Sequence, residues 1–234
     1  MSALWGWDCN NYTEGDVVEI SRSLKASAVG VRCSYSWENP GLQAIAVQQF
    51  QAHRAANIAT VSIPWVYWTE PPERCALSAI ETARMGWQDE GSYMILDVEE
   101  ARPIGWRDGD CHGWLSACVA EVEQRGWRAG IYCSRASWEA NCGSDAVGFE
   151  RLPLLLADYD GQAVLVSSQL PFAGWVNLAG KQYVDRPYDL DIFDTSVVFP
   201  CPDRTVVRLS LEAELLRGKP IRRSVVRAAA LALG

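Results

Sequence analysis

Two acidic residues, Asp97 and Glu99, stand at the end of an apolar run in the segment Leu96-Asp97-Val98-Glu99. Side chains alternate between the two faces of a β-strand, so a strand here would direct Asp97 and Glu99 to one side and Val98 to the other. Two carboxyl groups crowded on one face push their pKa values apart, so that one holds a proton while the other stays ionised. The pattern is typical of acid–base catalysis. The alternative interpretation is a pair of surface acids before a loop.

Acidic residues recur where other apolar, strand-like runs of this chain end. Besides Asp97 and Glu99, these acids are Asp8, Asp158 and Asp189. In a barrel of parallel strands the carboxyl ends of the strands meet on one face, which is where the active sites of such barrels lie. We therefore expect these acids to gather at one end of a barrel.

The hydrophobic periodicity predicts strands and helices in alternation. Strands are expected over residues 3–8, 28–33, 58–68, 93–98, 130–133, 152–159 and 178–184, with the segment 188–194 following, and helices over 15–25, 42–56, 75–87 and 111–125. Apolar strands with short connections favour a mainly parallel sheet with helices outside it, in a single-domain α/β barrel. A doubly wound open sheet is the alternative, but no GxGxxG motif follows the first strand, so a dinucleotide site is not supported.

The charge of the chain is unevenly distributed. Its 234 residues are 49% hydrophobic and carry a formal net charge of −8, which argues against a general nucleic-acid-binding protein. Residues 1–202 hold 14 basic and 26 acidic residues, whereas residues 203–234 hold 7 and 3. We predict a barrel domain over residues 1–200 and a basic extension over 201–234. Within the extension, residues 203–234 are expected to pack on the barrel, to dock onto a partner protein or to contact an anionic surface.

Cysteine and histidine are poorly placed for a zinc site. The eight cysteines include no CxxC pair, and the two histidines, His53 and His112, are far apart in the sequence. We predict no metal and no cofactor, and we expect most cysteines to be reduced and structural. No apolar segment is long enough to span a membrane, and no signal peptide is visible, so we expect synthesis in the cytoplasm.

Several short motifs occur in a particular order along the chain. They are Trp7-Asp8, Val31-Arg32-Cys33-Ser34-Tyr35, Leu96-Asp97-Val98-Glu99, Gly130-Ile131-Tyr132-Cys133-Ser134 with Trp138 downstream, Leu156-Ala157-Asp158-Tyr159, Gln182-Tyr183 and Tyr188-Asp189-Leu190-Asp191-Ile192-Phe193. Together they resemble the glycoside hydrolase family 25 (Chalaropsis-type) lysozymes over residues 3–196. The resemblance implies an irregular, TIM-like (β/α) barrel that cleaves the glycan of bacterial peptidoglycan between N-acetylmuramic acid and N-acetylglucosamine.

The resemblance also implies roles for individual residues. Glu99 would donate a proton to the leaving oxygen, and Asp97 would polarise the substrate's acetamido group or act as the second carboxylate. Asp8 and Asp189 would tune this pair and bind sugar. The predicted substrate-binding residues are Tyr35, Trp65, Tyr67, Tyr132, Trp138, Asp158 and Gln182. For any single aromatic residue among them, packing in the core or in a loop is the alternative.

The sequence departs from the family pattern near the predicted sugar-binding positions. Lys181 stands where the family usually has Trp before Gln-Tyr, and Asp191 stands where Asn is usual. The third strand ends in Trp65-Val66-Tyr67-Trp68 instead of the usual Tyr-His-Phe type. These differences concern the sugar subsites more than the acid pair.

Functions of two classes are consistent with these features. The first is a phage-encoded peptidoglycan muramidase that acts on the bacterial cell wall, as an endolysin or as a tail-associated lysin carried on the virion. The second is a catalytically weak or inactive glycan-binding or structural barrel of a phage tail assembly, for example in a minor tail protein, with residues 203–234 contacting other tail proteins. A hydrolase that acts on a different polysaccharide is a further alternative.

Overall fold

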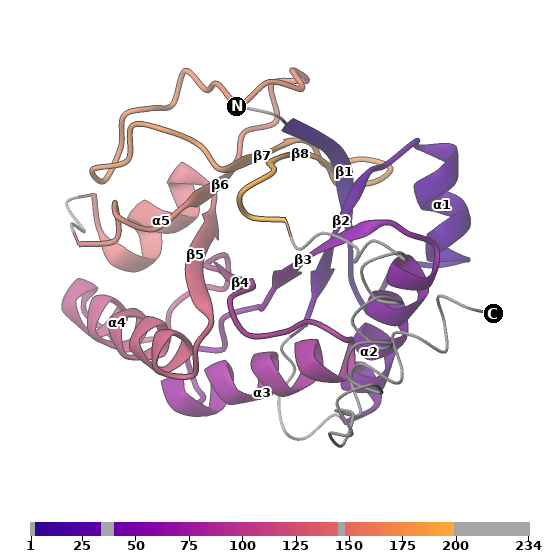
Figure 1. Ribbon diagram of the computed structural model, residues 1–234. Coiled ribbons are helices and arrows are strands. Elements are labelled where there is room, and N and C mark those ends of the chain that lie inside the picture. The colour runs from indigo at the N-terminus through magenta and orange to yellow at the C-terminus, as the bar shows by residue number, and fades with distance from the viewer. Residues whose placement is uncertain (1–2, 34–39, 145–147, 199–234) are drawn as a thin grey trace, which may run out of the picture.

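The computed structural model describes residues 3–33, 40–144 and 148–198, in which eight strands alternate with five helices (Figure 1). The strands are β1 (Ala3–Cys9), β2 (Ala28–Arg32), β3 (Ala59–Ile63), β4 (Tyr93–Asp97), β5 (Arg128–Cys133), β6 (Leu154–Ala157), β7 (Gly180–Val184) and β8 (Leu190–Asp194). The helices are α1 (Val17–Ser23), α2 (Pro40–Ala55), α3 (Pro72–Met85), α4 (Asp108–Gln124) and α5 (Arg135–Cys142). None of these five helices has the length and hydropathy needed to cross a lipid bilayer.

The eight strands close into one barrel in the order β1 to β8. Neighbouring strands from β1 to β7 run parallel, whereas β8 runs antiparallel to both β7 and β1. Helices lie outside the barrel along β1 to β6, but an irregular segment connects β6 to β7 in place of a helix (Figure 1). The prediction of an irregular, mainly parallel α/β barrel is confirmed. The basic segment 203–234 lies outside the described residues.

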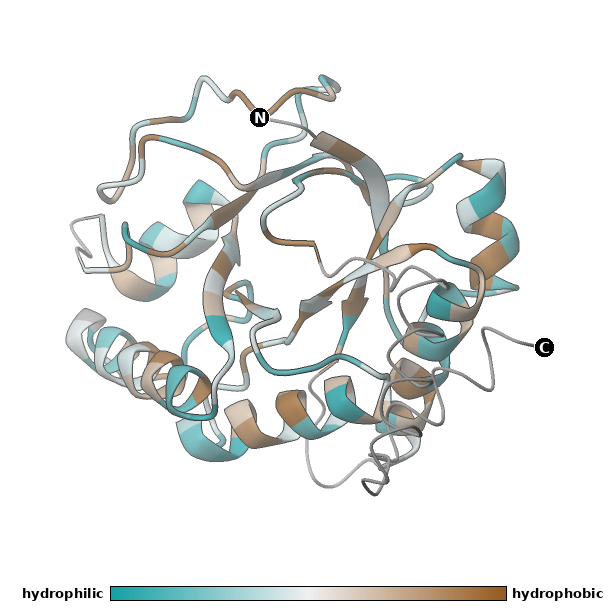
Figure 2. Ribbon diagram, viewed as in Figure 1, coloured by the Kyte–Doolittle hydropathy of each residue, from teal (hydrophilic) through white to brown (hydrophobic). Residues whose placement is uncertain are grey.

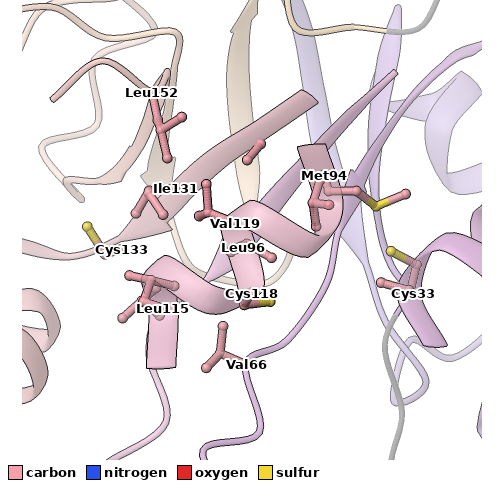
Figure 3. Close-up of a cluster of buried hydrophobic side chains, with 14 of the residues drawn as sticks. Cys33, Val66, Met94, Leu96, Leu115, Cys118, Val119, Ile131, Cys133 and Leu152 are labelled. Carbon is pink, nitrogen blue, oxygen red and sulfur yellow. The ribbon is translucent and has the colours of Figure 1, made fainter. Parts of the chain in front are cut away.

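Apolar side chains form two layers, one inside the barrel and one between the barrel and its helices. On β4, Leu96 belongs to the outer layer and Ile95 to the inner one. Figure 3 shows Leu115 and Val119 of α4 in the same cluster as Leu96. The helices carry both hydrophobic and hydrophilic residues, as expected for elements with one face on the barrel and one in solvent (Figure 2). Because side chains alternate along a strand, Asp97 shares the inward side of β4 with Ile95.

Strand β3 is shorter than the predicted strand 58–68, and its early end helps to position Asp97. The strand stops at Ile63, because Pro64 has no N–H to donate to a neighbouring strand. The carbonyl of Pro64 instead accepts a hydrogen bond from the N–H of Asp97 at 2.8 Å, and the N–H of Val66 donates to the carbonyl of Asp97 at 3.1 Å. Both bonds come from the segment 64–66, in which Trp65 forms a parallel bridge with Asp97, so this segment fixes the backbone of Asp97 beyond the end of β3.

Glycine makes room inside the barrel beside Asp8. A Cβ atom on Gly30 would lie 2.8 Å from the Cβ of Asp8 and 2.5 Å from the Cδ1 of Ile63. A Cβ atom on Gly6 would lie 2.7 Å from the Cε2 of Phe193. Side chains at these distances would have to move, so the inward faces of β1 and β2 need glycine at these two positions.

Candidate active site

The four acids predicted to be catalytic meet in one pocket at one end of the barrel. Asp8 is in β1, Asp97 is the last residue of β4, and Glu99 follows two residues later. Asp189 directly precedes β8, and the backbone N–H of Asp8 donates to its carbonyl at 3.0 Å. The pocket has a volume of about 160 Å³ and is lined by Asp8, Asn10, Arg32, Ile63, Trp65, Asp97, Glu99, Tyr132, Tyr159, Gln182 and Asp189.

Asp97 is buried with few compensating contacts. The residue is 7% exposed, and no donor among the described residues reaches its Oδ1 atom. Burial raises the pKa of Asp97 well above the usual range, and the nearby charge of Glu99 raises it further, while Arg32 lowers it. Placing a carboxyl in such surroundings costs folding free energy, which is common where a group is kept for chemistry.

Glu99 is less buried than Asp97 and is suited to hold a proton. Burial is the main cause that raises its pKa, and the charge of Asp189 adds to it. The neighbouring hydroxyl of Tyr132 and the charge of Arg32 act in the opposite direction. A carboxyl group with a raised pKa next to other acids is the arrangement expected of a general acid that works near neutral pH.

The pKa values of the other two acids are raised as well. Burial, followed by the charges of Asp189 and Glu99, raises the pKa of Asp8 well above its usual range. Burial and the charge of Asp185 raise the pKa of Asp189 to about 6. Because the four carboxyl groups repel one another when ionised, the pocket holds fewer than four negative charges at neutral pH.

Gln182 connects Asp8 to two tyrosines. Its Oε1 atom accepts hydrogen bonds from the hydroxyls of Tyr132 at 2.6 Å and Tyr159 at 2.9 Å, and its Nε2 atom donates to Oδ2 of Asp8 at 3.0 Å. Two hydroxyl donors on one side of the amide fix which side carries the oxygen, so the amide N–H must face Asp8. Gln182 is 3% exposed, and these three bonds hold its side chain in place beside Asp8.

Arg32 is the residue with a fixed positive charge among those that line the pocket. Its guanidinium carbon lies 3.9 Å from the ring centroid of Trp65, an attractive arrangement of a cation over an aromatic face. The charge of Arg32 lowers the pKa values of Asp8, Asp97 and Glu99. The pocket also contains residues for which the sequence predicts no site role, namely Arg32, Tyr159, Asn10 and Ile63. For Arg32 a signal was present, because a charged residue ends an otherwise small and apolar strand.

The predicted substrate-binding residues divide into three groups. Trp65, Tyr132 and Gln182 line the pocket. Tyr67 is partly buried and is not among the lining residues, although the charge of Arg32 acts on its pKa. Tyr35 lies outside the described residues.

Two of the predicted substrate-binding residues have structural surroundings and are not among the residues that line the pocket. Trp138 is 0% exposed in α5, and its ring packs against Trp175 with centroids 4.8 Å apart, so no sugar ring can reach it. Asp158 is 8% exposed and is not among the residues that line the pocket. It accepts hydrogen bonds from Ser167 Oγ at 2.5 Å and from Gln169 Nε2 at 2.8 Å, and so holds the segment that follows β6.

Within the part of the chain that the structure describes, no group of three or more His, Cys, Asp or Glu residues is arranged to hold a metal ion. The pocket itself brings together carboxyl groups, tyrosine hydroxyls and one guanidinium. A protonated carboxyl beside an ionised one suits the cleavage of an acetal bond, in which a leaving oxygen takes a proton while positive charge develops on carbon.

No protein-family model and no curated protein matches the sequence, whereas solved structures match the fold. A family GH25 lysozyme from Aspergillus fumigatus is 16% identical, with a TM-score of 0.63 over 82% of this chain and 94% of that one. The spore cortex lytic enzyme SleM from Clostridium perfringens is 16% identical, with a TM-score of 0.66 over 82% and 67%. The modular autolysin LytC from Streptococcus pneumoniae, in complex with a synthetic peptidoglycan ligand, is 13% identical, with a TM-score of 0.59 over 81% and 46%. The described chain therefore has the fold of the glycoside hydrolase family 25 lysozymes.

Proposed function

We propose that this protein is a muramidase, a glycoside hydrolase that cuts peptidoglycan between N-acetylmuramic acid and N-acetylglucosamine. The observation that carries the proposal is the convergence of Asp97 and Glu99 in one pocket, where burial and neighbouring acids raise both pKa values. The fold shared with structures of lysozymes and cell-wall lytic enzymes supports it. Such a site would cleave a glycosidic bond that lies between the protonated acid and the second carboxyl group.

In this proposal Glu99 is the general acid. Its proton passes to the glycosidic oxygen as the bond from that oxygen to the anomeric carbon breaks, and the sugar leaves as an alcohol. Repulsion between the two carboxyl groups leaves one of them ionised, and in this proposal it is Asp97, which faces the positive charge that develops at the anomeric carbon, either directly or through the acetamido group of the substrate. Water then adds to the anomeric carbon, and the proton that it loses restores Glu99.

The remaining lining residues bind and orient the glycan. Trp65, held under the guanidinium of Arg32, offers an aromatic face for a sugar ring. Tyr132 and Tyr159 bring hydroxyl groups to the pocket, where Gln182 fixes them. Asp8 and Asp189 raise the pKa of the proton donor or its neighbours through their charge.

The test is the digestion of purified bacterial cell walls by the full-length protein, followed as loss of turbidity. The reducing ends of the released fragments are identified by borohydride reduction and mass spectrometry. We expect N-acetylmuramic acid at the new reducing ends and a loss of activity of about 10²–10⁴-fold in Glu99→Gln. The matched control is Glu123→Gln, a surface acid that forms an ion pair with Arg151 at 2.8 Å. New ends of N-acetylglucosamine, or undiminished activity of Glu99→Gln, would contradict the proposal.

A role in a phage particle is a second candidate, and the charge distribution of the sequence favours it. A basic segment, residues 203–234, follows an acidic body, which suits docking onto an acidic partner. The enzyme would then be delivered to the wall as part of a tail, or the barrel would serve there as a glycan-binding part. Removing residues 203–234 should abolish assembly into particles and spare the hydrolysis of isolated walls. Loss of hydrolysis together with assembly would count against a docking role.

A further inference from the structure

Asp191 is an acid inside the barrel that the proposed reaction does not use. It lies on β8, paired in register with Gly6 of β1 on one side and with Gln182 of β7 on the other. The residue is 0% exposed and is absent from the residues that line the pocket. Its position two residues beyond Asp189 puts it on the same side of β8, deeper in the barrel.

Neither carboxyl oxygen of Asp191 has a hydrogen-bond donor among the described residues. The polar group within hydrogen-bond reach is the carboxyl of Asp8. The neighbouring cation does not serve as a counter-ion, because Nζ of Lys181 is 2.7 Å from Oδ2 of Asp160 and 3.0 Å from the carbonyl of Val166. Two carboxylates side by side in the interior would repel each other without compensation, whereas one proton between them gives a hydrogen bond.

The other groups that face Asp191 do not remove the need for this proton. Asp8 on β1 and Asp189 on β8 both raise the pKa of Asp191, in addition to its burial, which is the largest cause. On β7, burial and the charge of Asp191 raise the pKa of Tyr183 to about 12, so that Tyr183 is neutral. The amide of Gln182, the register partner of Asp191, already donates to Asp8.

We propose that Asp191 stays protonated at neutral pH and donates a hydrogen bond from its carboxyl group to Asp8, and so acts as a positioning residue for the acid pocket. Asp8 then accepts from two sides, from the Gln182 amide at 3.0 Å and from the Asp191 carboxyl. The shared proton keeps the Asp8–Asp191 pair at one negative charge instead of two. Asparagine at position 191 would supply the same kind of donor without a proton that can be lost.

The direct test is a pH titration of ¹³C-carboxyl-labelled aspartate by NMR in the wild-type protein and in Asp191→Asn. We expect a wild-type carboxyl resonance that remains in the acid form at pH values where ordinary aspartates, with a pKa of about 3.9, are ionised. This resonance should be missing in Asp191→Asn, whereas Asp8 should titrate at nearly the same pH there, because the asparagine amide still donates a hydrogen bond to it. The proposal is wrong if Asp191 titrates with the surface aspartates.

Thermal unfolding as a function of pH gives a second test that needs no enzymatic activity. A carboxyl with a raised pKa in the folded state binds more protons when folded, so its contribution to stability falls as pH rises from the unfolded pKa to the folded one. The difference in Tm between Asp191→Asn and the wild type should therefore increase in favour of the variant by roughly 3–5 °C per pH unit above about pH 4. A difference in Tm that does not change with pH would overturn the proposal, whatever the absolute stability of the variant.

The effect on catalysis rests on the proposed muramidase function and is measured separately. Asp191→Leu, which has a similar volume and no donor, should lower kcat on cell walls more than Asp191→Asn at pH 5. If the wild type does not digest walls, the muramidase proposal fails while the NMR and unfolding results still decide the state of Asp191. If walls are digested and Leu and Asn at position 191 are equivalent, Asp191 does not position Asp8.

Discussion

Asp97 and Asp158 look alike in the sequence and have opposite surroundings in the structure. Each stands at the end of a buried strand, and each is less than a tenth exposed, at 7% and 8%. Asp97 faces a pocket with other acids, and no described donor reaches its Oδ1 atom. Asp158 receives hydrogen bonds from Ser167 and Gln169, and both of its oxygens are used.

The difference follows from strand parity. In β4, Asp97 alternates with Leu96 and so lies on the inward side, together with Ile95. In β6, Ala157 belongs to the inner layer, so Asp158, one residue later, is directed away from the barrel interior. An acid at a strand end is therefore a candidate for catalysis only when its side chain points to the inward side of the strand. A buried acid whose oxygens all accept hydrogen bonds is more simply a structural residue.

Exchanging each of these aspartates for asparagine should give opposite results, and this is the largest effect we expect within the comparison. Asp97→Asn should lower kcat on cell walls by about 10²–10³-fold, because it removes a charge from the reacting centre. It should not lower the free energy of unfolding, because an incompletely paired buried carboxyl is replaced by a neutral group. Asp158→Asn should cost about 1–3 kcal/mol of stability and leave kcat unchanged.

The measurements are wall turbidity for activity and urea unfolding for stability. Each variant serves as the control for the other, since both change one buried carboxyl to an amide. The comparison breaks down if Asp158→Asn loses activity while remaining fully folded.

Two tryptophans extend the same contrast to aromatic residues. Trp138 is fully buried against Phe149 and Trp175, so Trp138→Ala should cost about 3–5 kcal/mol of stability. Trp65 lines the pocket, so Trp65→Ala should raise KM for wall fragments with a smaller loss of stability. Chemical denaturation and steady-state kinetics on soluble fragments check the pair. A KM effect of Trp138→Ala in folded protein would restore it as a binding residue.

Substitution of Lys181 tests whether polar contacts outside the pocket influence the residues that line it. Its side chain is 0% exposed and holds Asp160, the neighbour of Tyr159, whose hydroxyl donates to Gln182. Lys181→Met should lower stability by about 1–3 kcal/mol and weaken activity modestly through Tyr159. In a double-mutant cycle with Tyr159→Phe, the losses in kcat/KM should be less than additive. Fully additive losses would confine Lys181 to a structural role.

The pH profile offers the smallest and most specific test. Glu99 must be protonated to act, so kcat/KM should fall as pH rises through its raised pKa. The charge of Asp189 raises that pKa, so Asp189→Asn should move the alkaline limb to lower pH. The charge of Arg32 lowers it, so Arg32→Gln should move the limb to higher pH. Limbs that shift in the same direction would show that another group controls the alkaline side.

The acid at the start of β8 shows how a correct prediction can rest on an incomplete reason. The acids were expected to meet because the carboxyl ends of parallel strands meet. Asp189 reaches the same end of the barrel from the opposite direction, since it precedes a strand that runs antiparallel to both neighbours. Hydrophobic periodicity carries no information on strand direction, so the sequence could not distinguish these cases.

The sequence by itself determined the alternation of strands and helices, because runs of apolar residues with periods near 2 and 3.6 reflect local geometry. It also determined that Asp97 and Glu99 belong together, since they are two residues apart after one strand. Only the tertiary structure decided that Asp158 and Trp138 lie outside the acid pocket, that Arg32 enters it and that Asp191 is buried inside the barrel. Those outcomes depend on which face of a strand points inward and on contacts between residues far apart in the chain, and neither is encoded in local spacing.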